Sequence, residues 1–242
     1  MECFVNLSQV SGCDEGFLAV LGGSHRLHPD VVAAFLRLQQ AADEAGFALR
    51  AVSCYRSFER QLAIWNAKAT GVRPVLDNAG KPLQRDNCDD WQWVQAILRW
   101  SALPGSSRHH WGSDLDVYDA AAVAADFQVQ LTPEEVRDGG PFCALHDWFD
   151  GRIAGDRAEG FFRPYSFDAG GVAPERWHLS FAPLAAECER ILTPDALYAV
   201  LEQRSDFDLW PVVKQHWQEI YPRFVLAPDC AQARMATWGE GR

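Results

Sequence analysis

The chain has 242 residues, 48% of them hydrophobic, which predicts a single domain over 1–242 with a sizeable core. Its net charge of −11 argues against a nucleic-acid partner, because no basic stripe offsets the excess of acid. No run of residues is long and apolar enough to predict a membrane span.

The N-terminus and the cysteines bear on the cellular compartment. Residues 1–6 lack a basic segment followed by a long apolar stretch, so they do not resemble a secretory signal. The seven cysteines are scattered, odd in number and without a C-x-x-C pair, which predicts mostly reduced packing residues. We therefore expect a cytoplasmic protein. The alternative is a periplasmic or extracellular protein, exported by a route that the sequence does not reveal.

The first part of the chain predicts an alternation of helix and strand. Pro29 in a first turn and Gly46 at the end delimit a predicted helix. Residues 47–52 are typical of a strand, and Ser57 is a plausible N-cap for a helix that runs to about residue 69. A loop over 71–85 and a helix over 89–100 are expected to follow.

Residues 107–116 read SRHHWGSDLD and hold two histidines and two aspartates. Gly112 favours a tight turn, and residues 115–118 are typical of a short strand. A side chain on the loop and another on the strand can converge on a single metal ion.

The following segment, residues 120–172, contains no pattern that specifies chemistry. It is long and lies between the chemically suggestive stretches, which makes it a reasonable place for substrate selectivity. We expect a weakly specified stretch over 120–129, a helix start at 132–135, a short helix over 142–149, a loop over 151–160 and an edge strand or cleft wall over 161–165.

A second stretch, Glu175-Arg176-Trp177-His178, supplies a further histidine and a glutamate for the same site. Residues 177–181 alternate like a strand, and Glu175 and His178 lie three positions apart, so the backbone must turn for both to face one ion. Catalytic zinc sites combine three protein ligands, an open position for water and a nearby base. We predict that His109, Asp116 and His178 are the ligands and that Glu175 lies outside them.

The C-terminal part predicts mainly helices. We expect helices over 183–191, from 194 onward and over 210–220, then a returning strand over 221–225 and poor order from 227.

The motifs carry a resemblance to a known family. The pattern S-x-H-x-x-G-x-x-x-D at 107–116, followed by E-x-W-H at 175–178, resembles the zinc D-alanyl-D-alanine carboxypeptidases and dipeptidases (VanY/VanX-like, peptidase family M15). The resemblance implies that His109, Asp116 and His178 bind one Zn²⁺ ion and that Glu175 is the catalytic base. It also implies an α+β fold, in which helices surround a small, largely antiparallel sheet that carries the site.

An earlier segment, Tyr55-Arg56-Ser57, is similar to the family's Y-R-S motif, with Gln61 five residues after the arginine. By resemblance Arg56 and Gln61 hold the substrate, Arg56 also stabilises the oxyanion, and Ser107 donates a hydrogen bond to the substrate. Their simpler interpretations are a structural ion pair for Arg56, a solvated helix position for Gln61 and a turn residue for Ser107.

Two positions leave the ligand set open. The family has a small residue where this chain has Asp114, and Asp114 and Asp116 lie on one face if they belong to a strand. Spacing favours Asp116, with Asp114 as an alternative ligand or an outer partner. His109 and His110 pose the same question, and spacing favours His109.

The resemblance predicts a zinc peptidase that hydrolyses peptidoglycan-type peptides, most directly a D-Ala-D-Ala carboxypeptidase. The motif-bearing core covers about 28–205, with extensions at both ends. Alternatives are an L,D-carboxypeptidase, an L-Ala-D-Glu endopeptidase, a non-catalytic zinc-stabilised binding module, or a thiol enzyme using Cys54. Two histidines and one carboxylate also serve iron(II) oxygenases, but the Glu175/His178 pair favours zinc.

Overall fold

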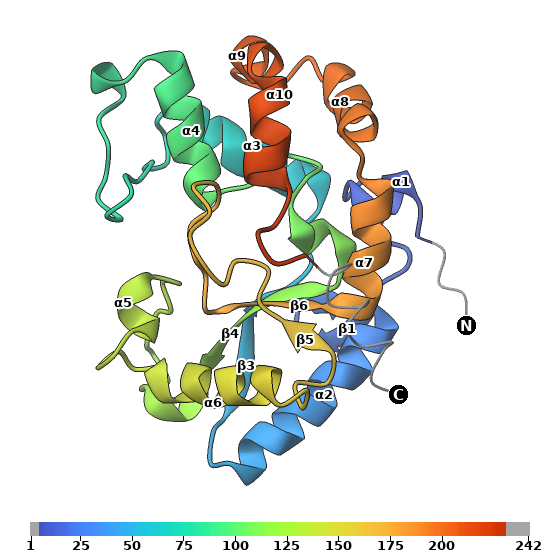
Figure 1. Ribbon diagram of the computed structural model, residues 1–242, viewed down its shortest axis with the longest axis vertical. Coiled ribbons are helices and arrows are strands. Elements are labelled where there is room, and N and C mark those ends of the chain that lie inside the picture. The colour runs from blue at the N-terminus through green and yellow to red at the C-terminus, as the bar shows by residue number, and fades with distance from the viewer. Residues whose placement is uncertain (1–4, 231–242) are drawn as a thin grey trace.

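Two antiparallel sheets organise the computed structural model, which describes residues 5–230 (Figure 1). The larger sheet has four strands in the order β3-β4-β6-β5. The smaller sheet is the hairpin of β1 (Ala19–Gly22) and β2 (His25–Leu27). The larger sheet comprises β3 (Leu49–Ser53), β4 (Asp114–Asp119), β6 (His178–Phe181) and β5 (Phe161–Phe162). The predicted α+β class with a small antiparallel sheet is confirmed.

The pairing of β4 with β6 fixes which side chains share a face of the sheet. Asp116 lies directly opposite His178, and Asp114 lies directly opposite Ser180. Because side chains alternate along a strand, these four polar residues occupy one face. The opposite face holds apolar residues that are fully buried in the core: Leu115, Val117 and Leu179.

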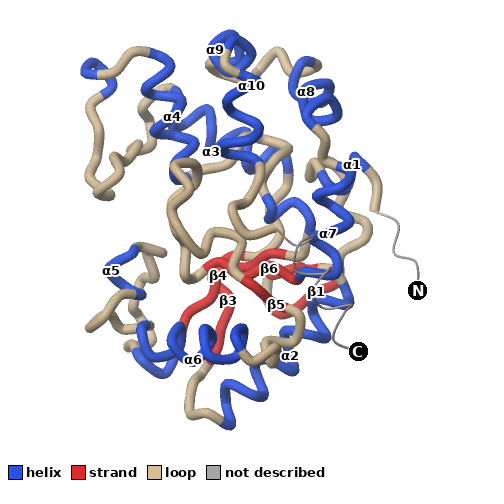
Figure 2. Tube along the Cα trace, in the orientation of Figure 1, coloured by secondary structure: helices blue, strands red, loops and turns tan. Residues whose placement is uncertain are grey.

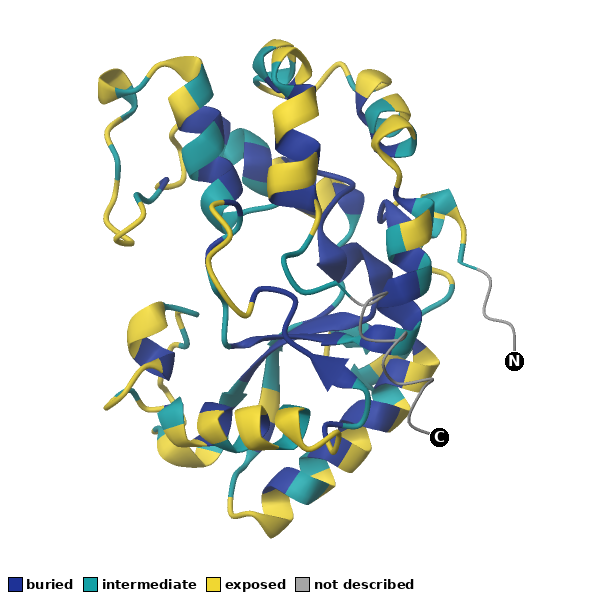
Figure 3. Ribbon diagram, in the orientation of Figure 1, coloured by how far each residue is buried: buried dark blue, intermediate teal, exposed yellow. Residues whose placement is uncertain are grey.

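Helices surround the larger sheet, as Figures 1 and 2 show, with α2 and α6 on one side and α3, α4 and the C-terminal helices on the other. The long helix α2 (Pro29–Glu44) turns Val31, Phe35 and Leu38 into the core. Figure 3 shows the same pattern for the whole fold, since buried residues gather around the sheet and exposed ones lie on the outer faces of the helices. The other long elements are α3 (Phe58–Ala69), α4 (Asp90–Trp100), α6 (Cys143–Ala154) and α7 (Ala182–Ile191).

Capping residues set two helix starts as the sequence predicts. Ser57 Oγ accepts a hydrogen bond from the backbone N–H of Arg60 at 3.2 Å and begins α3. Asp89 and Gln92 form a reciprocal capping box at the start of α4. The short elements are α1 (Leu7–Val10), α5 (Pro133–Val136) and the 3₁₀ turns Arg85–Asn87, Arg108–Trp111 and Ala120–Ala122.

The C-terminal region departs from the prediction at two points. The expected helix over 210–220 is divided into α9 (Trp210–Gln215) and α10 (Trp217–Ile220), after α8 (Pro194–Glu202). The predicted strand over 221–225 is wrong, because Tyr221–Val225 forms a π-helical turn that continues α10. The buried residues Trp217, Ile220, Tyr221, Phe224 and Val225 recur at helical spacing, so a helical path buries them all. The predicted poor order from 227 falls largely on 231–242, outside the described residues.

Two further expectations concern the whole chain. No helix within residues 5–230 combines the length and the hydropathy needed to cross a membrane. The six cysteines in the same range are not paired in disulfides, and their predicted reduced state stays a prediction.

Candidate active site

A cavity of about 290 Å³ opens over the polar face of β4 and β6, and residues from every predicted motif line it. These residues are Arg56, Ser107, His109, Asp116, Glu175 and His178. The walls are completed by residues that include Lys68, Leu76, Trp100, Ala102, Leu131, Tyr165, Val172 and Trp177.

Three buried side chains form a candidate metal centre in this cavity. One ligand atom each from His109, Asp116 and His178 lies within 4.8 Å of the other two. His109 Nε2 lies 3.3 Å from Asp116 Oδ2, and His178 Nδ1 lies 3.2 Å from Asp116 Oδ1. Asp116 Oδ1 is buried and has no hydrogen-bond partner within the described residues 5–230. A buried carboxylate oxygen without a hydrogen-bond partner, next to two imidazoles, fits a site for a divalent metal ion. Two histidines and one carboxylate are a common set of zinc ligands.

His109 is oriented by the segment that carries Arg56. Its Nδ1 lies 2.8 Å from the carbonyl oxygen of Cys54. Because a carbonyl can only accept, Nδ1 carries the proton and Nε2 keeps its lone pair toward the cavity. The backbone N–H of Arg56 donates in turn to the carbonyl of His109 at 3.1 Å, so the two motifs are tied together.

His178 is oriented by Asp114, which lies behind it and does not line the cavity. His178 Nε2 lies 2.9 Å from Asp114 Oδ1, which leaves Nδ1 facing the cavity. Burial by itself lowers the pKa of His178, but the hydrogen bond to Asp114 and the negative charges of Asp114 and Asp116 outweigh it and raise the pKa to about 10. Asp114 is thus an outer partner of the candidate metal centre, the second of the two roles considered for it.

Arg108 fixes Asp114 in turn. Its Nε donates to Asp114 Oδ1 at 3.0 Å, and its Nη1 donates to Glu189 at 2.9 Å. The hydroxyl of Ser180 also donates to Asp114, at 3.0 Å. Burial would raise the pKa of Asp114, but Arg108 and His178 outweigh it and hold that pKa well below its usual range.

His110 is excluded as an alternative ligand. Its Nδ1 lies 2.6 Å from the carbonyl oxygen of Arg56, and its Nε2 accepts the N–H of Gly105 at 3.1 Å. Both ring nitrogens are therefore used, and burial lowers the pKa of His110 to about 3. This neutral histidine joins two loops and takes no part in the metal group.

Glu175 and His178 are brought together by a turn, as their spacing requires. The N–H of His178 donates to the carbonyl of Glu175 at 3.2 Å, and the N–H of Glu175 donates to the carbonyl of Tyr165 at 3.0 Å. Glu175 Oε2 lies 3.6 Å from His178 Nδ1. Burial is the main cause that raises the pKa of Glu175 to about 7, which suits a group that exchanges protons near neutral pH.

Arg56 lines the cavity, whereas Gln61 lies behind it. Arg56 Nη1 donates to Gln61 Oε1 at 2.8 Å, and Gln61 Nε2 donates to the carbonyl of Ala102 at 2.7 Å. Gln61 is completely buried and is not part of the cavity wall. Its amide therefore holds the guanidinium in place, which differs from the expected contact with substrate. Ser107 is buried and lines the cavity.

Two residues of the site escaped sequence reasoning, since Lys68 and Arg108 also line the cavity. Tyr165 lines it too and lies in the segment 161–165, for which a cleft wall is one of the two expected roles. For Lys68 a signal existed, because it follows Gln61 by seven positions and two helical turns return a side chain to the same face. Cys54, by contrast, is buried, and burial raises the pKa of its thiol to about 12, which disfavours the thiolate that a nucleophile needs.

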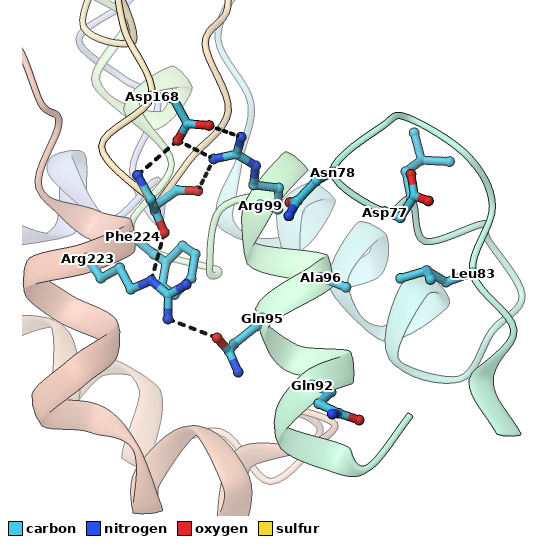
Figure 4. A pocket seen from close by; sticks show the side chains of 13 residues that line it. Asp77, Asn78, Leu83, Gln92, Gln95, Ala96, Arg99, Asp168, Arg223 and Phe224 are labelled. Carbon is cyan, nitrogen blue, oxygen red and sulfur yellow. Dashed lines mark hydrogen bonds and ion pairs between the residues drawn. The ribbon is translucent and has the colours of Figure 1, made fainter. Parts of the chain in front are cut away.

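A second cavity, of about 400 Å³, adjoins the first and shares Leu76 with it. Figure 4 shows Arg99 and Arg223 reaching from opposite walls to the loop that contains Asp168. Arg99 donates to both carboxylate oxygens of Asp168, at 2.8 and 2.6 Å, and to the carbonyl of Gly171 at 2.9 Å. Arg223 Nε donates to the carbonyl of Gly170 at 2.7 Å. The loop that leads to Glu175 is therefore held from two sides.

Two relatives from Haemophilus influenzae, both described as uncharacterized proteins, resemble this chain. One is 54% identical over 80 residues, which cover 33% of this chain and 55% of the relative, so the match spans about half of that protein. The other is 31% identical over 96 residues, which cover 39% of this chain and 72% of the relative.

Three solved structures are among those to which this chain is similar. VanYB in complex with D-alanine-D-alanine is 19% identical, with a TM-score of 0.49 and coverage of 79% of this chain and 91% of that one. A mutant of the D,D-pentapeptidase VanY in complex with Zn(II) is 20% identical, with a TM-score of 0.47 and coverage of 76% and 88%. The L,D-carboxypeptidase LdcB is 20% identical, with a TM-score of 0.47 and coverage of 80% of each chain.

The family comparison gives the broadest match. The model of the VanY family, described as D-alanyl-D-alanine carboxypeptidase, matches residues 24–184. This range contains all three motifs and more than half of the chain. The protein therefore belongs to the VanY family of D-alanyl-D-alanine carboxypeptidases, as its motifs predict.

Proposed function

We propose that this protein is a zinc-dependent peptidase that acts on peptidoglycan-type peptides as a D-Ala-D-Ala carboxypeptidase. The observation that carries this proposal is the convergence of His109, Asp116 and His178 beside the buried Glu175 in one cavity. Membership of the VanY family supports the substrate class.

The metal would be held by Nε2 of His109, a carboxylate oxygen of Asp116 and Nδ1 of His178. When bound, zinc supplies Lewis acidity that lowers the pKa of water and polarises a carbonyl group. The unpaired oxygen of Asp116 and the outer hydrogen bonds of both histidines support this ligand set.

The side chains around that centre divide the rest of the work. Glu175 accepts a proton from the attacking water and returns it to the leaving amine as the C–N bond breaks. Arg56 stabilises negative charge on the carbonyl oxygen, and Gln61 keeps its guanidinium in position. Ser107 donates a hydrogen bond to the substrate from the cavity wall.

The test is mass spectrometry of products from zinc-loaded protein and a pentapeptide that ends in D-Ala-D-Ala. We expect the loss of one alanine. Glu175→Gln should bind zinc as the wild type does, yet lose activity by at least about 100-fold, because the proton acceptor is gone. Wild-type turnover in this variant would refute the role of Glu175.

The other outcomes identify the alternatives. Cleavage only of a tetrapeptide points to an L,D-carboxypeptidase, and cleavage inside a peptide with a blocked C-terminus points to an endopeptidase. If folded, zinc-loaded protein cleaves none of these peptides, the carboxypeptidase proposal fails in favour of a binding module.

A further inference from the structure

Lys68 is a cation in the catalytic cavity whose ammonium group makes no direct hydrogen bond or ion pair among residues 5–230. It lies on α3, two turns after Gln61, and lines the same cavity as Arg56 and Glu175. The residue is only half-buried, and within the described chain its ammonium group makes no hydrogen bond or ion pair. Arg108 also lines this cavity, but it is buried and its guanidinium is paired with Asp114 and Glu189.

The charges in the cavity leave room for an anion. A divalent metal ion would balance the carboxylates of Asp116 and Glu175, so the charges of Arg56 and Lys68 stay uncompensated. Burial, followed by the repulsion of Arg73 and Arg56, lowers the pKa of Lys68 to about 8, and the charge of Glu175 offsets only part of this shift. A lysine with this pKa is still mostly protonated at neutral pH and is stabilised by an incoming negative charge. Such a concentration of positive charge stands out in a chain of net charge −11.

The chemistry of the bond that is cut suggests which anion this is. An endopeptidase substrate continues on both sides of the scissile bond as neutral amides. A carboxypeptidase substrate instead ends in a carboxylate one residue after that bond. The walls of the same cavity include small or aliphatic residues that suit an alanine methyl group: Leu76, Ala102, Leu131 and Val172.

We propose that Lys68 binds the free C-terminal carboxylate of the peptide and thereby makes this site specific for the last residue of the chain. The inference rests on the proposed function and adds to it the residue that selects a carboxyl terminus. Arg56 is less suited to this role, since it stabilises the carbonyl oxygen in the proposed function. One N–H of each of its terminal nitrogens already faces a protein acceptor, Gln61 Oε1 for one and Ser53 Oγ for the other.

The experiment compares two peptides that end in D-Ala-D-Ala, one with a free C-terminal carboxylate and one with a C-terminal amide. For each peptide, kcat/KM is measured with zinc-loaded protein that has Glu175, and Kd is measured with zinc-loaded Glu175→Gln protein. Each measurement is made with Lys68 and again with the Lys68→Met substitution. Lys68→Arg tests rescue by another cation. Lys214→Met is the matched control, because Lys214 is an exposed lysine that pairs with Glu202 on the surface.

We expect Lys68→Met to weaken binding and kcat/KM for the free acid by about 10- to 100-fold, the range for one charge-assisted hydrogen bond. The amide should change by less than about threefold, Lys68→Arg should recover much of the loss, and Lys214→Met should behave as the wild type. Equal losses for acid and amide overturn the proposal, as does a wild-type site that binds both peptides equally.

The two proposals fail in different ways. If no peptide is cleaved, the proposed function fails, while the acid-against-amide difference in Kd still decides the role of Lys68. If the acid is cleaved as fast by Lys68→Met as by the wild type, the peptidase stands and the carboxylate contact is refuted.

Discussion

Each histidine of the candidate metal centre is oriented through the ring nitrogen that faces away from the cavity. A backbone carbonyl does this for His109 and a carboxylate for His178. Only the carboxylate partner can be removed by mutation, because it belongs to a side chain and not to the backbone. The family pattern has a small residue at this position, and this chain has Asp114 instead.

Asp114→Asn should weaken zinc binding by about 10- to 100-fold, because an amide holds the imidazole of His178 less firmly than a carboxylate. The substitution also removes the negative charge that pairs with buried Arg108, and it should therefore lower the stability of the fold. Glu189→Gln is the control, since it removes the other carboxylate of Arg108 and leaves His178 untouched. Competition with a chromogenic chelator measures the affinity, and an unchanged Kd in Asp114→Asn would contradict this role.

The sequence predicted much of the site at this scale. Motif spacing indicated that His109, Asp116 and His178 converge, and they do, while zinc binding itself stays a prediction. The outer network could not be predicted in the same way. Arg108 and Glu189 are 81 positions apart, and no local spacing relates them.

At the scale of elements, the sheet and the loops contribute differently to the site. Asp116 and His178 lie on paired strands, whereas Glu175 follows a loop that is held by Arg99 and Arg223. A change in this loop should therefore affect the base and leave the metal ligands in place.

Arg99→Met removes three hydrogen bonds to the loop that contains Asp168. We expect kcat/KM to fall by roughly 10- to 100-fold, the range for a catalytic group displaced by about 1 Å, with the zinc Kd unchanged. Arg37→Met, which breaks an exposed ion pair with Glu159, is the control and should leave both values unchanged. A loss of zinc affinity in Arg99→Met would show that loop and ligands are not independent.

Helices with caps and clear periodicity were predictable, and short aromatic segments were not. Ser57 and Asp89 mark two helix starts where the sequence places them. Residues 221–225 are rich in aromatic and β-branched side chains, which is typical of a strand. Their burial in a helical turn depends on the tertiary core, which the local sequence does not specify.

At the scale of the whole molecule, metal binding should be linked to folding, because the ligands come from two stretches of chain that are far apart in the sequence. A metal ion that binds the folded chain in preference to the unfolded one would stabilise it by mass action. Chelation should therefore lower the melting temperature.

The size of this stabilisation should rise with pH. The raised pKa of His178, about 10, means that zinc must displace a proton from the metal-free protein throughout the neutral range. Zinc affinity then increases about tenfold per pH unit, so the stabilisation at pH 8 exceeds that at pH 6 by about 2.7 kcal/mol. Calorimetry with and without chelator at the two pH values measures this difference. A zinc-induced shift that is equal at both would contradict the linked proton.

The direct pairing of Asp116 with His178 has a consequence for how the chain tolerates insertions. The spacing of two paired strands, and not the length of the segment between them, sets the distance between these two side chains. Extra residues in the exposed stretch 124–128 can be absorbed without moving either one. One extra residue inside β4 turns Asp116 to the opposite face of the sheet. The same chain is thus permissive to changes of length in its connections and intolerant of a single added residue in a central strand.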